Sequence, residues 1–596
     1  MPLVTAVFTL TRRIVARSKG KGEIRSVRAL AVVGIFAALV IGLHRPIGSE
    51  LRYVAAAQEM VRGGDWIVPH LSFVPYLEKP ILIYWVLAAS QMVLGVSNLA
   101  SHLPSALAAW AMILVTYRLG AELGVRATGC RAGWILAGCG LFLVLESLSL
   151  TDNLLALFVS ISMFLSHRHF NARRGSERRL LWMVMGFAWL AKGPIGLVLP
   201  TSAIIGERWL SVGSRGVVRA LASLAPVRGF AILAAVIGPW HLAVGLRDVR
   251  HLECFYWHVN LGGVFAQRGM NHPEPLYYYA LALPLAWFPW HALAPVAAAR
   301  TIAHGLVARH SNRDARANAA RFITAWCLFP LLVLSLSASK LPTYLLPILP
   351  AMALAVSLGL ELGPKTGQRA LRWAGAAQSI LGLLAGVALP FVIAGPIEQI
   401  AAPWRPALIV AIAIVLIGQV VGGWVAARGD VRRGFVLTGL TFALPLVCLA
   451  PFAHRVLPNW GVYSLAEIAA HKIGAGDKVV VSQSCVQRYE ILMRLGRRPF
   501  IWGPARELGY GHFVEATSRD TPLPAVLSTI DAALIPRNSW LLDEGRLAEL
   551  SRRPERLWMF CKKRQVSRLQ ELDSAWGVVA TSTDFVLLSN RVDAAH

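Results

Sequence analysis

The stretch PALIVAIAIVLIGQVVGGWVAA, residues 406–427, contains no charged side chain. A helix needs about 20 consecutive apolar residues to cross the hydrocarbon core of a bilayer. The apolar residues in this run are continuous rather than alternating, so we expect a helix and not a strand of a membrane barrel. Similar runs recur along the chain, and together they predict an all-α polytopic membrane protein.

The composition indicates the same class of protein. The chain has 596 residues, of which 56% are hydrophobic, and its mean hydropathy is +0.54. Its net charge of +27 comes from arginines in short clusters between apolar runs, as expected for loops that face the cytoplasm and anionic membrane lipid. We therefore expect no nucleic-acid partner. The seven cysteines form no CxxC pair, and a disulfide between Cys485 and Cys561 would require an oxidising compartment.

Fourteen apolar runs are candidate spans, but the distribution of charge excludes one of them. If residues 81–97 crossed the membrane, the arginine-rich loop 118–131 would lie outside, against the positive-inside rule. Residues 81–97 contain Tyr84 and Trp85, which favour the headgroup level, so we expect a helix in the membrane interface. The thirteen remaining runs are 28–43, 99–119, 129–146, 152–167, 179–191, 194–209, 228–245, 276–298, 321–337, 342–360, 371–395, 406–427 and 433–453.

This topology divides the chain into three parts. Residues 1–27 form a basic cytoplasmic N-terminus, and residues 28–453 form the transmembrane domain, with an outer loop at 44–98. After that domain the composition becomes that of a soluble protein. In residues 457–596, AEIAAHKI and RYEILMRL predict helices, whereas DKVVVS, AALIP and GVVATSTDFVLLSN predict strands. We expect a small α/β domain on the outer face.

The polar loop between Arg45 and Pro80 is the first candidate for an active site. Isolated charges beside a bilayer are costly and tend to be retained for function. Glu78 and Lys79 precede the interfacial helix directly, where the carboxylate could bind a metal or take a proton while the ammonium holds a phosphate. The alternative is an interfacial ion pair that reaches toward water. The polar residues of this loop are Glu50, Arg52, Tyr53, Asp65, Glu78 and Lys79.

Four further candidates lie in predicted outer turns. Asp152 begins a span in LSLTDNLLALF, where it is either a helix cap or a site residue. Lys192 and Lys340 each precede a proline in an outer hairpin, and they are either simple loop lysines or contacts for an anionic substrate. Tyr344 is expected one helical turn from Lys340 on the same face.

The outer segment 255–279 brings histidines and aromatic residues together. His258 and His272 could join Glu78 around a divalent metal, although interfacial histidines also occur without a ligand. The sequence has no HExxH, GxSxG, Walker or dinucleotide-binding motif, so zincin, hydrolase, NTPase and dehydrogenase functions have no support.

Several motifs, taken in order, resemble one family. They are ELRYVAAAQEM, GDWIVPHL, YLEKPILIYW, HLPSAL, LTDNLLALF, LAKGPIGLVLP, HPEPLYYY and SKLPTYLLPILP. Over roughly residues 28–360 the chain resembles the GT-C class of glycosyltransferases that use polyprenyl-phosphate sugars, namely the bacterial aminoarabinose transferases and their protein O-mannosyltransferase relatives. The C-terminal region is similar in architecture only.

The resemblance implies an inverting transferase that moves a sugar from undecaprenyl phosphate to lipid A on the periplasmic face of the bacterial inner membrane. The sugar is expected to be 4-amino-4-deoxy-L-arabinose. The resemblance implies that Glu78 helps to hold a divalent metal such as Zn, Mg or Mn. With the residue patterns above, we expect Glu50 and Asp152 to be catalytic and His258 and His272 to be further metal ligands. The carrier phosphate and substrate would be bound by Arg52, Tyr53, Lys79, Lys192, Lys340 and Tyr344.

The sequence also departs from the family pattern. The usual Asp-Glu pair at the end of the first span reads Ser49-Glu50, and two expected arginines read His102 and Gly263. Other functions therefore stay open: transfer of another sugar to a different envelope glycan or to protein, a lipid-linked sugar transporter, or an inactive binding scaffold.

Overall fold

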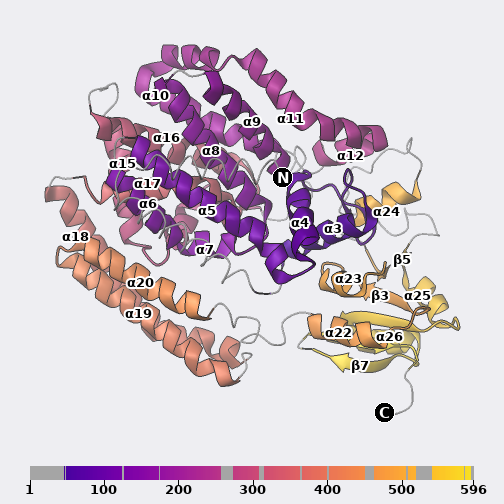
Figure 1. Cartoon of the computed structure of the whole chain (residues 1–596). Helices are drawn as coiled ribbons and strands as arrows, with labels where there is room; N and C mark the ends of the chain where they lie inside the picture. The colour runs from indigo at the N-terminus through magenta and orange to yellow at the C-terminus, as the bar shows by residue number, and fades with distance from the viewer. Residues whose placement is uncertain are drawn as a thin grey trace. The chain divides into compact units, whose positions relative to one another are not determined.

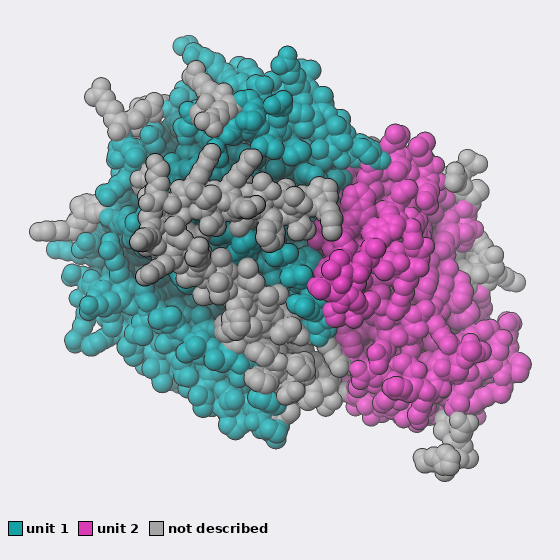
Figure 2. Space-filling view, in the orientation of Figure 1, with its two compact units in different colours: residues 1–45, 98–239, 271–456 teal, residues 46–97, 240–270, 457–596 magenta. Residues whose placement is uncertain are grey.

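The structure is a computed structural model of the chain (Figure 1). It describes residues 44, 46, 48–123, 126–172, 175–256, 273–307, 314–362, 365–398, 402–449, 462–504, 508–517, 540–582 and 584–591. The chain forms two compact units, shown in two colours in Figure 2. Unit 1 comprises residues 1–45, 98–239 and 271–456, and unit 2 comprises residues 46–97, 240–270 and 457–596.

Unit 1 is helical throughout its described residues. Its longer helices pack in pairs that follow one another in sequence, such as α8 with α9 and α18 with α19. The elements are α5 (Asn98–Glu122), α6 (Arg126–Ala137), α7 (Gly140–Glu146), α8 (Thr151–Ala172), α9 (Gly175–Lys192), α10 (Ile195–Ser223), α11 (Pro226–Arg247), α14 (Tyr278–Ala286), α15 (Leu293–Val307), α16 (Ala315–Leu336), η2 (Pro342–Ile348), α17 (Leu349–Gly359), α18 (Lys365–Glu398), η3 (Ala402–Trp404), α19 (Arg405–Ala427) and α20 (Val431–Leu449). Helix α11 continues from unit 1 into unit 2.

The chain is a multi-pass membrane protein. Among the described residues, six helices are long and apolar enough to cross a membrane, and a seventh span results if α6 and α7, which are bent by 63° at their break, count as one. The run 129–146 is thus a broken helix rather than a straight one. The total of thirteen spans stays a prediction.

Glycines allow the membrane helices to approach closely. A Cβ atom added at Gly120 of α5 would lie 2.4 Å from Cα of Gly129 in α6. On α19, a Cβ at Gly422 would lie 2.1 Å from the Thr438 hydroxyl of α20. Because lipid supplies no hydrophobic driving force between helices, small residues at the contact stabilise the bundle through close packing.

The C-terminal part of unit 2 is an α/β domain. Its six-stranded sheet has the order β5-β4-β3-β6-β8-β7, in which β5, β4, β3 and β6 are parallel and β8 is antiparallel to both neighbours. The elements are α22 (Tyr463–Lys472), β3 (Lys478–Ser482), α23 (Glu490–Leu495), β4 (Phe500–Trp502), α24 (Gly509–Ala516), β5 (Leu541–Leu542), α25 (Glu544–Ser551), β6 (Leu557–Lys562), η8 (Lys563–Gln565), α26 (Val566–Leu572), β7 (Gly577–Thr581) and β8 (Phe585–Ser589). The predicted class, a helical membrane protein with a small C-terminal α/β region, is confirmed, and the AALIP run lies outside the described residues.

The first outer loop has more regular structure than the sequence predicted. It contains α3 (Glu50–Gly63) and α4 (Leu82–Leu94). Between them lies a hairpin of two short antiparallel strands, β1 (His70–Leu71) and β2 (Val74–Pro75). Helix α3 ends at Gly64, whose φ of 74° lets its N–H donate back to the Met60 carbonyl at 3.0 Å. The polar loop between Arg45 and Pro80 thus contains a helix and a hairpin that the sequence analysis did not identify.

Unit 2 is assembled from three separate segments of the chain. The predicted topology has six spans in each interval between consecutive segments, so it would place all three segments on the same side of the membrane.

One glycine tests how the hairpin packs in unit 2. A Cβ at Gly511 of α24 would lie 2.5 Å from the Pro75 carbonyl oxygen and 2.7 Å from Val74 Cβ. We expect Gly511→Val to destabilise unit 2 by about 1–3 kcal/mol, because backbone atoms have to move. Thermal unfolding of the purified protein measures this. Gly476→Ala is the control, since no atom lies within 4 Å of the added Cβ, and an equal loss in both variants would contradict the packing.

Candidate functional site

In unit 1, the predicted residues Asp152 and Lys192 form a buried ion pair. Asp152 is the second residue of α8 and Lys192 is the last residue of α9, so the α8–α9 hairpin brings both to the same end of the two helices. The Lys192 ammonium also lies 4.3 Å from the centre of the Tyr344 ring. A buried lysine held by a carboxylate and an aromatic face has a fixed position. Asp152 is thus more than a helix cap.

Lys340 differs from its prediction. Its buried ammonium donates to the carbonyls of Ser337 at 2.6 Å and Glu274 at 2.8 Å. Helix η2 begins only at Pro342, so Lys340 does not share a helical face with Tyr344. That expectation was wrong, because the proline-rich sequence delays the helix start by two residues. Two of the three N–H donors of Lys340 bind these carbonyls.

Three further residues of unit 1 lie near Asp152. Glu146, at the end of α7, is 2% exposed, and neither of its carboxylate oxygens has a hydrogen-bond partner among the residues that the structure describes. It interacts electrostatically with Asp152, as does Tyr279. Asn153 fixes the turn between α7 and α8, since its side-chain amide donates to the Leu145 and Leu148 carbonyls at 3.1 and 2.7 Å.

In unit 2, the predicted residues Arg52 and Glu78 also form an ion pair. Arg52 Nη1 lies 3.2 Å from Glu78 Oε2, and the Tyr76 hydroxyl donates to the same oxygen at 2.8 Å. Arg52 Nη1 and the Tyr76 hydroxyl are 3.3 Å apart, so the three side chains form a closed set. Tyr76 was not predicted, and its position two residues before Glu78 was the available signal.

The other predicted residues of the first loop surround this set. Glu50 is buried in the first turn of α3, and Lys79 is half-buried next to Glu78. The Tyr53 ring lies 5.8 Å from the Arg52 guanidinium and 6.1 Å from the Tyr84 ring, edge to face. The sequence motif thus places a carboxylate, a guanidinium and phenol rings within one part of unit 2.

The second segment of unit 2 holds this loop in place. The Trp240 indole donates to the Ile67 carbonyl at 2.9 Å, and Arg247 pairs with Asp65 at 3.2 Å. His251 contacts the Tyr510 hydroxyl of α24, and burial lowers the His251 pKa to about 4, so this imidazole is neutral. Asp65 is therefore a structural residue of the loop.

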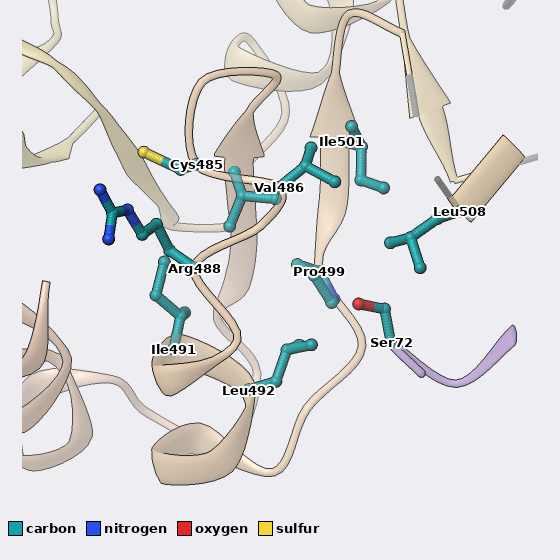
Figure 3. Close-up of a pocket in the computed structure, with 10 residues that line it drawn as sticks. Ser72, Cys485, Val486, Arg488, Ile491, Leu492, Pro499, Ile501 and Leu508 are labelled. Carbon is teal, nitrogen blue, oxygen red and sulfur yellow. The ribbon is translucent and has the colours of Figure 1, made fainter. Parts of the chain in front are cut away.

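A small pocket of about 230 Å³ lies between the hairpin and the C-terminal domain (Figure 3). Its walls are mainly apolar side chains of β3, α23 and the segments beside them, and Ser72 at the hairpin tip lies near Pro499 and Leu508. Its size and apolar walls are those of a packing gap, so the polar clusters are the better candidates for chemistry.

The predicted metal ligands are only partly within the described residues. His258 and His272 lie outside them, as does Gly263. Glu78 Oε2 already accepts from Arg52 and Tyr76, which stabilises the carboxylate without a metal. A divalent metal at Glu78 stays a prediction. His102 is buried, with Nδ1 2.8 Å from the Asn98 carbonyl oxygen.

The chain is similar to membrane glycosyltransferases in sequence and in fold. Residues 78–241 match the family model described as dolichyl-phosphate-mannose-protein mannosyltransferase. The crystal structure of ArnT from Cupriavidus metallidurans in the apo state superposes with a TM-score of 0.75 at 19% identity, covering 96% of this chain and 98% of that chain. The structure of that protein bound to undecaprenyl phosphate gives a TM-score of 0.74.

Two curated relatives carry the same name, undecaprenyl phosphate-alpha-4-amino-4-deoxy-L-arabinose arabinosyl transferase. The one from Pseudomonas aeruginosa is 29% identical over 411 residues, covering 67% of this chain and 69% of the relative. The one from Yersinia enterocolitica is 29% identical over 420 residues, covering 68% and 72%. The chain is thus similar in sequence to the aminoarabinose transferases and, over residues 78–241, to the protein mannosyltransferase family.

The buried ion pair of unit 1 gives a test of its role. We expect Lys192→Met to lower transfer activity at least about 100-fold, because a preorganised cation is lost. The variant also leaves Asp152 buried without its partner, which destabilises the protein. The double variant Asp152→Asn/Lys192→Met is the matched control, since it removes both charges. It should recover thermal stability without recovering activity, and recovery of activity would contradict a role in catalysis.

Proposed function

We propose that this protein transfers 4-amino-4-deoxy-L-arabinose, or a closely related sugar, from undecaprenyl phosphate to lipid A. The observation that carries the proposal is the match over two thirds of the chain to relatives named for this donor and sugar. The structure of a protein with the same fold bound to undecaprenyl phosphate supports the same carrier. The reaction would take place on the periplasmic face of the inner membrane, where the predicted topology places the loops that hold the candidate residues.

The chemistry of the two clusters suits this reaction. The bond between the anomeric carbon and the phosphate oxygen breaks as an acceptor oxygen bonds to the opposite face of that carbon, which inverts the configuration. Negative charge builds up on the leaving phosphate, and fixed cations stabilise it. The predicted cations Arg52, Lys79, Lys192 and Lys340 would supply this charge, with Tyr53 and Tyr344 as further substrate contacts.

Two carboxylates are proposed for the acceptor side. Asp152 and Glu50 would orient the acceptor or take its proton, if it has one. A lipid A phosphate is already a nucleophile and needs less help from a base than a protein hydroxyl. The Ser49-Glu50 sequence, which lacks the usual aspartate, therefore mildly favours a lipid phosphate as acceptor. A divalent metal, if Glu78 holds one, would add positive charge near the phosphate.

A second candidate function is transfer of a sugar to protein or to another envelope glycan. The match of residues 78–241 to the protein mannosyltransferase model favours it. Purified protein supplied with the undecaprenyl-phosphate sugar and either lipid A or peptide acceptors separates the two candidates, because product forms only with the correct acceptor.

The first test is mass spectrometry of lipid A from cells with and without the protein. We expect deletion to remove the aminoarabinose mass increment and the wild-type chain to restore it. Glu78→Ala should not restore it, because the ion pair with Arg52 and the bond from Tyr76 are lost. Lys79→Ala should instead raise the KM for the carrier.

Glu549→Ala is the matched control for Glu78→Ala, since its carboxylate pairs with Arg553 on the exposed surface of α25. It should restore the increment fully. An unchanged lipid A profile on deletion would refute lipid A as the acceptor, and full activity of both Glu78→Ala and Lys79→Ala would refute the site in unit 2.

A further inference from the structure

The turn of the β1–β2 hairpin has a backbone that its residues do not favour. Ser72 and Phe73 connect the two strands, and their φ angles are +59° and +62°. Two positive φ values in a two-residue hairpin loop are typical of a type I′ turn, for which Asn-Gly is the preferred sequence. Neither residue here is glycine or asparagine, so the turn requires support from outside the hairpin.

Glu59 of α3 supplies that support. Its Oε1 accepts the Ser72 N–H at 2.8 Å, and its Oε2 accepts the Phe73 N–H at 2.8 Å. One carboxylate thus binds both amides of the strained turn through separate oxygens. Hydrogen bonds from backbone amides to an ionised acceptor are among the stronger ones in proteins.

The same helix holds the other end of this segment. Glu59 and Arg52 are seven residues apart, which is nearly two full turns, so both side chains leave α3 on one face. Arg52 contacts Tyr76 and Glu78, whereas Glu59 binds the turn at Ser72 and Phe73. Between these two attachments, the Tyr76 N–H donates to the Pro69 carbonyl at 2.8 Å across the base of the hairpin.

We propose that Glu59 is a positioning residue of the proposed transferase. By binding the amides of Ser72 and Phe73, it fixes the path of the chain from the hairpin tip to Tyr76, and so fixes where the Glu78 carboxylate lies against Arg52. The inference rests on the proposed function for its consequence in catalysis, but the attachment itself does not depend on the substrate.

Neighbouring residues limit the conformations that the turn can adopt. Val74 and Pro75 pack against Gly511, and Ser72 lies beside Pro499 and Leu508 (Figure 3). Without the Glu59 carboxylate, the N–H groups of Ser72 and Phe73 would lose their hydrogen-bond acceptor, and the turn offers them no strand pairing in its place. The turn would then relax toward negative φ values and displace the residues that follow it.

Opposing effects act on the pKa of Glu59. Burial raises its pKa to about 7, although the two backbone N–H groups and the cations Arg62 and Arg498 oppose this shift. Arg498 itself pairs with Glu515 at 2.5 Å. His512, on the same helix as Glu515, has its pKa lowered to about 3 by burial and stays neutral.

Protonation of Glu59 therefore changes the attachment near neutral pH. Only the ionised carboxylate accepts through both oxygens, so one of the two bonds weakens as the pH falls below about 7. The stability of the folded protein depends on pH in the opposite direction to this attachment. Because the pKa of Glu59 in the folded protein lies above the ordinary value of 4.5, its contribution to stability is full below pH 4.5 and is lost as the pH rises to about 7.

Glu59→Gln separates positioning from a purely structural role. In full-length protein we expect transfer activity to fall about 10-fold to 100-fold above pH 7, because one amide of the turn then faces an NH₂ donor and the site shifts. The loss of transfer activity that we expect in the wild-type protein below pH 7 should be smaller in Glu59→Gln. The thermal midpoint above pH 7 should not decrease, since a buried charge is removed. A parallel loss of stability and activity would overturn the proposal.

Two further variants sharpen the result. Glu490→Gln is the matched control, because it neutralises another buried carboxyl of unit 2 whose pKa is also raised by burial. It should leave the pH profile of transfer unchanged. Phe73→Gly, combined with Glu59→Gln, should restore most of the activity, because glycine adopts a positive φ without support. If the double variant stays as inactive as Glu59→Gln, the turn is not what Glu59 controls.

Amide hydrogen exchange tests the attachment without any substrate. In Glu59→Gln we expect faster exchange at Ser72 and Phe73, and also at Tyr76, whose bond to Pro69 depends on the hairpin path. Unchanged exchange, or faster exchange confined to Ser72 and Phe73, would overturn positioning. If exchange extends to Tyr76 but wild-type protein transfers no sugar to lipid A, the proposed function fails while the attachment stands.

Discussion

A charged side chain beside a bilayer is stable only where another charge or fixed hydrogen bonds replace the water that it has lost. Two of the candidate carboxylates meet that condition with a particular partner. Asp152 has Lys192 in unit 1, and Glu78 has Arg52 and Tyr76 in unit 2. These pairs hold their side chains in one orientation before any substrate arrives. Since preorganised charge needs no rearrangement during the reaction, the same interactions that keep the fold intact prepare it for phosphate chemistry.

The sequence predicted the individual charges better than their partners. Asp152 and Lys192 were recognisable because each interrupts apolar sequence at a predicted outer turn, but only the α8–α9 hairpin shows that they pair. Tyr344 was expected one helical turn from Lys340 on the same face, but η2 begins only at Pro342, so Lys340 precedes the helix. The class of fold was predictable from hydropathy and charge alone, since both depend on composition over long windows rather than on contacts.

Residues whose partners are backbone atoms escaped sequence analysis. Glu59 lies in an ordinary helical segment, AAAQEM, where a glutamate predicts a solvated surface position. Its two carboxylate oxygens accept hydrogen bonds from backbone N–H groups thirteen and fourteen residues away. These N–H groups belong to a turn whose sequence does not predict positive φ angles. Glu146 was visible as a carboxylate in an outer turn, but the sequence did not show that it is buried with no hydrogen-bond partner among the described residues. Such features follow from tertiary structure and have no local pattern.

The three-segment composition of unit 2 also matters for how the protein is made. The hairpin is synthesised early, whereas α24, which packs against Val74 and Pro75, comes from the last segment of the chain. Until α24 is synthesised, the hairpin lacks the packing partner of Val74 and Pro75. Contacts so distant in sequence form slowly and leave partly folded intermediates exposed. A nascent chain that stops before the C-terminal domain would therefore carry an unfinished first loop, a ready substrate for envelope chaperones and proteases.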